Sequence, residues 1–333
     1  MPDPPTNCSH PDCLWEEPVG VMKTVKLSVP VVVTIIYVPL MLFGLLGNIL
    51  TILVVWLRPH MRSSTYLYLS SMAISDLLIL LLLPLDLYKL WRPRPWPLGD
   101  LACKLTMFLS ECCTFCTILH ITFLSLERYV AVCWPITAKT LVTRRRTRAI
   151  IGCLWLGAAV SAAPVLLMVG VEDIGGDEAD RRECRCTQYA ISSGLLSAMM
   201  ILSNLYFLVP LSILGLVYSL IGRTLWLRPK SSRKEQGHRN TVKMLGVIVL
   251  AFVLCWLPFH VGRTIFSLSL GSYFNLVSSV LFYLSAAINP LLYNLMSARY
   301  RLAVRISHSS TTYSEIRGYP RINPIILRAK SHK

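Results

Sequence analysis

The feature that most constrains the fold is a series of long apolar segments separated by short polar stretches. A helix needs about 20 apolar residues to cross the hydrocarbon core of a bilayer. We expect such helices at 27–56, 64–90, 101–134, 149–170, 195–222, 241–268 and 273–296. The sequence therefore predicts an all-α membrane protein, built as a bundle of seven transmembrane helices.

The composition agrees with a membrane protein and argues against a nucleic-acid-binding one. Apolar residues make up 54% of the 333 residues and charged residues only 15%, whereas charged residues are about a quarter of soluble domains. The net charge of +16 comes from basic residues that lie between the apolar segments, and they form no nucleic-acid motif. We expect a lipid bilayer around the chain and no nucleic acid as a partner.

The distribution of Lys and Arg predicts the orientation. The segments 57–63, 135–148 and 223–240 and the tail are rich in Lys and Arg, whereas the segment 171–180 is acidic. Basic loops remain in the cytosol, so the amino terminus is predicted outside. We expect an extracellular segment at 1–26, a transmembrane domain at 27–296 and a cytoplasmic tail at 297–333.

The predicted outer segments carry sites for covalent modification. Asn7 begins an Asn-Cys-Ser glycosylation sequon, which is used only on the lumenal side. Cys103 lies at the outer end of the third helix, and Cys184 and Cys186 lie in the next outer loop. The oxidising side permits a disulfide there. The spacing leaves the partner of Cys103 open, and we favour Cys184. No cysteine spacing indicates a zinc site.

Several ionisable residues fall within the predicted helices. A charge at the centre of a membrane helix costs at least about 2.5 kcal/mol, so each one requires an explanation. The residues are Asp76, Asp86, Glu111, His120, Glu127, Arg128, His260 and Arg263.

Asp76, Asn48 and Asn289 lie at similar depths in three helices. A carboxylate among amides and hydroxyls can hold a sodium ion or a water cluster, and the alternative is a purely structural polar network. Nearer the outside, Asp86, Glu111 and Arg263 could line a shared ligand cavity, and the alternative is an exposed rim with no common cavity.

The tripeptide Glu127-Arg128-Tyr129 ends the third helix at the predicted inner face. The two charges could pair with each other, or Arg128 could turn toward a cytosolic partner. Ordinary snorkelling of long side chains at a helix end is the alternative.

Taken together, these motifs resemble those of the rhodopsin-like (class A) G-protein-coupled receptors, across roughly 27–300. The resemblance implies a plasma-membrane receptor that is not an enzyme, with a heterotrimeric G protein of the Gq type and arrestin as partners. A sodium ion is the only cofactor it suggests. The motifs are Gly47-Asn48, Leu69 to Asp76, Trp96 before Cys103, Glu127-Arg128-Tyr129, Trp155, Pro210 with Tyr218, Cys255-Trp256-x-Pro258 and Asn289-Pro290-x-x-Tyr293.

The resemblance also implies roles for individual positions. Glu127, Arg128 and Tyr129 engage the G protein, and Asp76, with Asn48 and Asn289, forms the sodium site. Cys103 bridges to the second outer loop. The residues that rearrange on activation are Trp256, Pro258, Tyr218, Asn289, Pro290 and Tyr293.

Two positions exclude classes of ligand within the family. Tyr283 stands where retinal-binding members have a Schiff-base lysine, so the chain is not expected to sense light. Ser110 stands where aminergic members have an aspartate, so a monoamine is not expected as the ligand.

The closest resemblance is to the motilin and ghrelin receptor family, through Pro84 to Trp91, Cys255 to Arg263 and Phe282 to Pro290. In that family a third-helix glutamate and a sixth-helix arginine form a salt bridge that divides the ligand pocket, and Glu111 and Arg263 hold those positions. The implied ligand-binding residues are Asp86, Glu111, Phe259, His260, Arg263 and Phe282.

The stretches Leu119 to Thr122, Leu141 to Arg146 and Leu87 to Trp96 look more like the motilin receptor, whereas Lys243 to Leu245 and the acidic outer loop look more like the ghrelin receptor. We favour motilin as the peptide hormone, with acyl-ghrelin as the alternative. A membrane transporter is a distant alternative, which would predict internal repeats that we do not find.

Overall fold

The computed structural model describes residues 19–57, 63–92, 94–173, 182–227, 233–266 and 272–296, with the backbone alone for parts of the first and the last two long helices. The elements, in chain order, are α1 (Val19–Leu57), α2 (Ser64–Trp91), α3 (Gly99–Cys133), α4 (Pro135–Leu141), α5 (Arg144–Ala162), α6 (Val165–Met168), β1 (Val169–Asp173), β2 (Arg182–Cys186), α7 (Gln188–Ser192), α8 (Leu195–Leu227), α9 (Arg233–Phe266) and α10 (Ser272–Met296).

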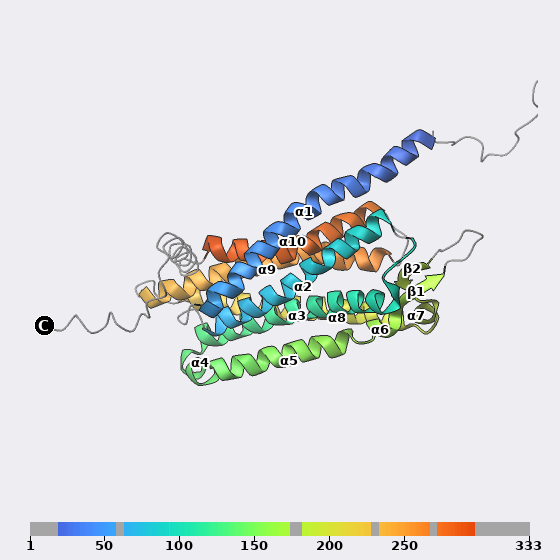
Figure 1. Cartoon of the computed structure of the whole chain (residues 1–333). Coiled ribbons are helices and arrows are strands. Elements are labelled where there is room, and N and C mark those ends of the chain that lie inside the picture. Colours follow the sequence, from blue (N-terminus) through green and yellow to red (C-terminus); the bar gives the residue numbers. More distant parts are fainter. Residues whose placement is uncertain are drawn as a thin grey trace, which may run out of the picture.

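The long helices α1, α2, α3, α5, α8, α9 and α10 form one elongated bundle, with α4 at one end and the β1–β2 hairpin at the other (Figure 1). Helix α3 contacts α2, α5, α8 and α9, and α10 contacts α1, α2 and α9. The predicted bundle of seven long helices is therefore confirmed.

Among the described residues, five helices are long and apolar enough to cross a membrane, and α9 and α10 contain the shorter apolar stretches Gly246–Val261 and Val277–Leu291. The polar and apolar side chains are also distributed as in a membrane protein. Phe43 and Leu46 on α1 are 65% and 70% exposed, whereas Asn48, Asp76 and His120 are buried in the bundle. An apolar exterior around a polar interior is the arrangement that a lipid environment favours.

Several helices are longer than predicted, because hydropathy marks only the part inside the hydrocarbon. Helix α8 continues to Leu227 and α9 begins at Arg233, so much of the expected loop 223–240 is helical. Helix α5 begins at Arg144 rather than at residue 149 and ends at Ala162, just before Pro164. The rest of the predicted fourth span, up to residue 170, is the short helix α6 and the start of β1.

The hairpin is an element that the search for apolar segments did not predict. Strands β1 and β2 pair antiparallel, with Val169 opposite Cys186 and Val171 opposite Cys184. Strand β2 is polar, and the apolar start of β1 merges with the predicted fourth span, so hydropathy does not mark the hairpin. The two strands position the disulfide described below.

Candidate functional site

Motif residues from three helices meet between α1, α2 and α10. The Asn289 amide donates to the Asp76 carboxylate at 2.9 Å. The Asn48 amide donates to the backbone carbonyls of Gly44 at 2.9 Å and Ala286 at 3.0 Å, so its hydrogens bind α1 and α10 rather than Asp76. The structure thus joins Asp76 to Asn289 of α10, and Asn48 binds the backbone of α10 at Ala286.

A small cavity of about 10 Å³ lies beside this network and is lined by Thr117, Trp256, Ser285 and Asn289, among others. That volume holds about one water molecule. Hydroxyl and amide oxygens beside a buried carboxylate fit either a water molecule or a sodium ion, so the sodium site remains a prediction.

At the predicted inner end of α3, the charges of the Glu127-Arg128-Tyr129 motif pair with each other. The Arg128 guanidinium donates to the Glu127 carboxylate at 3.0 Å, and the two side chains are 17% and 8% exposed. Nearby, the Ser125 and Tyr218 hydroxyls lie 3.4 Å apart, which links α3 to α8. Tyr129 packs against an apolar cluster shared by α3 and α8. Glu127, Arg128 and Tyr129 are therefore largely covered by the bundle.

The predicted switch residue Trp256 belongs to a layer of aromatic side chains. Phe282 lies against both Trp256 and Phe259, with ring centroids 5.4 and 5.0 Å apart. His260 stacks on Phe207 at 4.6 Å, which joins α9 to α8. Three of the predicted ligand-binding residues, Phe259, His260 and Phe282, therefore lie in contact with the switch or its neighbours.

Asp86 has a partner that the sequence analysis did not assign to it. The Tyr283 hydroxyl donates to the Asp86 carboxylate and links α10 to α2. One turn further along α2, the Lys89 ammonium lies 5.1 Å from the centre of the Trp96 ring. The sequence indicates of Tyr283 only that it replaces the lysine that binds retinal, and no local pattern predicts its contact with Asp86.

Other predicted residues are described in part or not at all. Glu111 on α3 is buried, with 7% of its surface exposed. The side chains of Arg263 and Tyr293, and all of Asn7, lie outside the described residues. The predicted Glu111–Arg263 salt bridge therefore stays a prediction.

A buried polar chain between α2, α3 and α5 was also not predicted. The Trp155 indole donates to the Ser71 hydroxyl at 2.9 Å, and that hydroxyl lies 2.9 Å from Nε2 of His120. The His120 Nδ1 lies 2.7 Å from the Cys116 carbonyl oxygen. The sequence marked His120 as a costly intramembrane residue, and this chain of bonds explains its placement.

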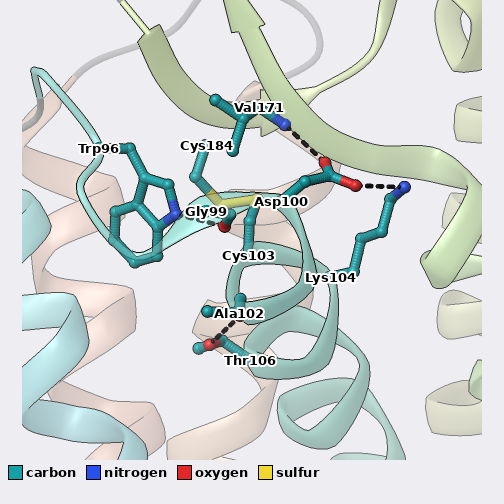
Figure 2. The surroundings of a disulfide bond; sticks show 9 residues. All are labelled: Trp96, Gly99, Asp100, Ala102, Cys103, Lys104, Thr106, Val171 and Cys184. Carbon is teal, nitrogen blue, oxygen red and sulfur yellow. Dashed lines mark hydrogen bonds and ion pairs between the residues drawn. A yellow bond between two sulfur atoms is a disulfide. The ribbon is translucent and has the colours of Figure 1, made fainter.

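At the opposite end of the bundle from α4, the predicted disulfide is confirmed: Cys103 pairs with Cys184 (Figure 2). The bond ties strand β2 to the first turns of α3. Asp100, beside it in Figure 2, accepts from the Val171 backbone amide at 3.0 Å and pairs with Lys104 at 2.6 Å. Both strands of the hairpin are thus attached to α3.

The loop before α3 strengthens this attachment. The Trp96 indole donates to the Gly99 carbonyl at 2.9 Å, and its backbone amide donates to the Arg182 carbonyl at 2.8 Å. Gly99 has φ of 77°, a conformation that glycine adopts most readily. Arg94 pairs with Glu183 at 3.0 Å.

Cys186 is the alternative that the C-R-C spacing left open, and its thiol is free. Burial raises the pKa of the Cys186 thiol, and the nearby Glu172 carboxylate raises it further. A thiol with a raised pKa is a weak nucleophile near neutral pH.

Comparison with known proteins places these features in a family. The model of the seven-transmembrane receptors of the rhodopsin family matches residues 47–293, which is most of the chain. The chain belongs to the rhodopsin family. It is therefore a multi-pass membrane receptor and not an enzyme, as its motifs implied.

Growth hormone secretagogue receptors and a motilin receptor are among the curated proteins to which this rhodopsin-family receptor is similar. It is 50% identical to the pig growth hormone secretagogue receptor type 1, over 91% of this chain and 89% of the relative. It is 52% identical to the human protein of that name, over 82% and 79%. It is 43% identical to the human motilin receptor, over 83% and 80%. The predicted membership of this receptor family is confirmed.

Proposed function

We propose that the chain is a plasma-membrane receptor for an extracellular peptide hormone and that it activates a heterotrimeric G protein of the Gq type. The observation that carries the proposal is the identity of 50% to a growth hormone secretagogue receptor over about nine-tenths of both chains. Relatives that match along the whole bundle share its outer and inner ends, so they support both a hormone outside and a G protein inside.

The mechanism we propose is a shift between two populations of the bundle. In the state described here, Arg128 is paired with Glu127, and Tyr218 lies beside Ser125. An agonist that binds the open state more tightly shifts the population toward it. Release of Arg128 then opens an inner groove that accepts a helix of the G protein. A sodium ion beside Asp76 would favour the closed state, and arrestin would bind the same inner end.

The sequence motifs favoured motilin, but identity is higher to a growth hormone secretagogue receptor, at 50%, than to the motilin receptor, at 43%, so for the hormone we propose acyl-ghrelin as the first candidate. Motilin is the second candidate. The stretches Leu87 to Trp96 and Leu141 to Arg146, which look like the motilin receptor, favour it.

The test is calcium release in cells that express the chain, titrated with acyl-ghrelin and motilin in parallel. A response at nanomolar concentration supports the proposal and identifies the peptide. Binding without calcium release contradicts the Gq coupling. Silence to both peptides, with the chain present at the cell surface, contradicts the proposed class of hormone.

A further inference from the structure

The turn of α10 that carries Phe282 and Tyr283 connects two parts of the bundle that the proposed function uses separately. Tyr283 bonds to Asp86 on α2, and its ring meets that of Tyr37 on α1 edge-on at 5.1 Å. The neighbouring residue Phe282 packs on Trp256 of α9 at 5.4 Å. A movement of this turn therefore changes contacts to α1, α2 and α9 together.

The hydrogen bond from Tyr283 also occupies the Asp86 carboxylate. A buried carboxylate that accepts a hydroxyl hydrogen is stabilised by that bond, and removing the donor leaves the charge poorly solvated. A ligand ammonium that binds the Oδ2 oxygen of Asp86 must compete with the Tyr283 hydroxyl, which donates to that oxygen. The ammonium is the stronger partner, because its bond to the carboxylate is charge-assisted.

We propose that Tyr283 is a positioning residue that holds Asp86 in the ligand-free receptor. When the ammonium of a peptide hormone binds Asp86, it displaces the Tyr283 hydroxyl. The turn that carries Phe282 and Tyr283 is then free to move relative to Trp256. This inference rests on the proposed function, because it needs a ligand with a free amino group. It adds to that function the residue Tyr283, whose contacts change when the ligand binds Asp86 and which transmits that change to the switch residue Trp256.

The first variant is Tyr283→Phe, which keeps the ring against Tyr37 and removes the hydroxyl. The ligand then reaches Asp86 without having to displace the Tyr283 hydroxyl, so its apparent affinity rises. We expect Tyr283→Phe to bind a peptide with a free amino terminus about 3- to 10-fold more tightly than the wild type. The same peptide with an acetylated amino terminus should bind both receptors equally, since it carries no ammonium.

The matched control is Tyr37→Phe, which removes a hydroxyl from the same aromatic cluster. In this cluster the Tyr37 ring packs edge-on against the ring of Tyr283. We expect this variant to leave the affinity for both peptides unchanged. An equal gain for the free and the acetylated peptide in Tyr283→Phe, or no gain for either, would overturn the proposal.

A second measurement tests the hydrogen bond between Tyr283 and Asp86 without any ligand. In purified receptor, Tyr283→Phe should lower the melting temperature, because Asp86 loses its donor, but it should have a much smaller effect in an Asp86→Ala background. Equal effects in the two backgrounds would show that the two side chains are not coupled. If the wild type binds neither peptide, the proposed hormone class fails, and the melting temperatures alone decide whether Tyr283 holds Asp86.

Discussion

His120 illustrates how surroundings fix the chemical state of a single residue. Its Nδ1 faces the Cys116 carbonyl oxygen, which can only accept, so Nδ1 carries a hydrogen. The neutral ring then accepts at Nε2 from the Ser71 hydroxyl, which in turn accepts from the Trp155 indole. One neutral tautomer satisfies every bond in the chain, so His120 needs no charge in the membrane.

Replacing this ring tests that account. His120→Leu removes both bonds, so the buried Ser71 hydroxyl loses its acceptor and the Cys116 carbonyl loses its side-chain donor. We expect the free energy of unfolding to fall by about 1–3 kcal/mol, measured as a lower melting temperature of the purified receptor. Thr140→Ala, which removes an exposed bond to the Thr137 carbonyl, is the control and should change little. An unaltered melting temperature in His120→Leu would show that the chain of bonds contributes nothing to stability.

Residue identities were easier to predict from the sequence than residue partners. Asp76, Arg128 and Trp256 follow from motifs with fixed spacing, and the structure gives each a set of contacts. Tyr283 and Asp86 are separated by 197 positions, and no local pattern reports a contact over that distance. The choice of Cys184 over Cys186 was also open, because the register of the hairpin decides it.

Among the elements, α1 and α10 approach closely through a glycine. A Cβ on Gly47 would lie 2.8 Å from Cβ and 3.0 Å from Cγ of Pro290, both in a rigid ring. Gly47→Ala should therefore cost about 1–3 kcal/mol of stability through overpacking. Gly152→Ala on α5, where nothing lies within 4 Å, should be neutral or stabilising by up to about 1 kcal/mol. Thermal unfolding of the two variants side by side measures the difference, and equal melting temperatures would rule out the close packing.

The hairpin is held to α3 by one covalent bond in addition to its hydrogen bonds and ion pairs. The disulfide closes a loop with a sequence separation of 81 residues, and removing such a bond typically costs about 2–5 kcal/mol. We expect Cys103→Ser to lower both the melting temperature and the affinity for the peptide, because β2 is released from α3. Cys186→Ser should leave both unchanged, since that thiol is free. A loss in Cys186→Ser as large as that in Cys103→Ser would contradict the assigned pairing.

For the whole molecule, the bundle connects the predicted outer region around Asp86 with the predicted inner region around Arg128. The fold class was predictable because apolar segments of membrane length admit few structures. The helix ends were not, because α8 and α9 continue into polar sequence where hydropathy gives no signal. The closed pairing of Arg128 with Glu127 is the feature that the proposed activation must change.

The most direct test of the central claim is nucleotide exchange on a purified Gq heterotrimer, with the receptor reconstituted in lipid nanodiscs and the peptide hormone added. We predict that the wild type accelerates exchange when the peptide is bound, and that Arg128→Ala binds the peptide but does not accelerate exchange. Full exchange by Arg128→Ala would contradict the role of Arg128, and a peptide-bound wild type without exchange would contradict the account of the chain as a Gq-coupled hormone receptor.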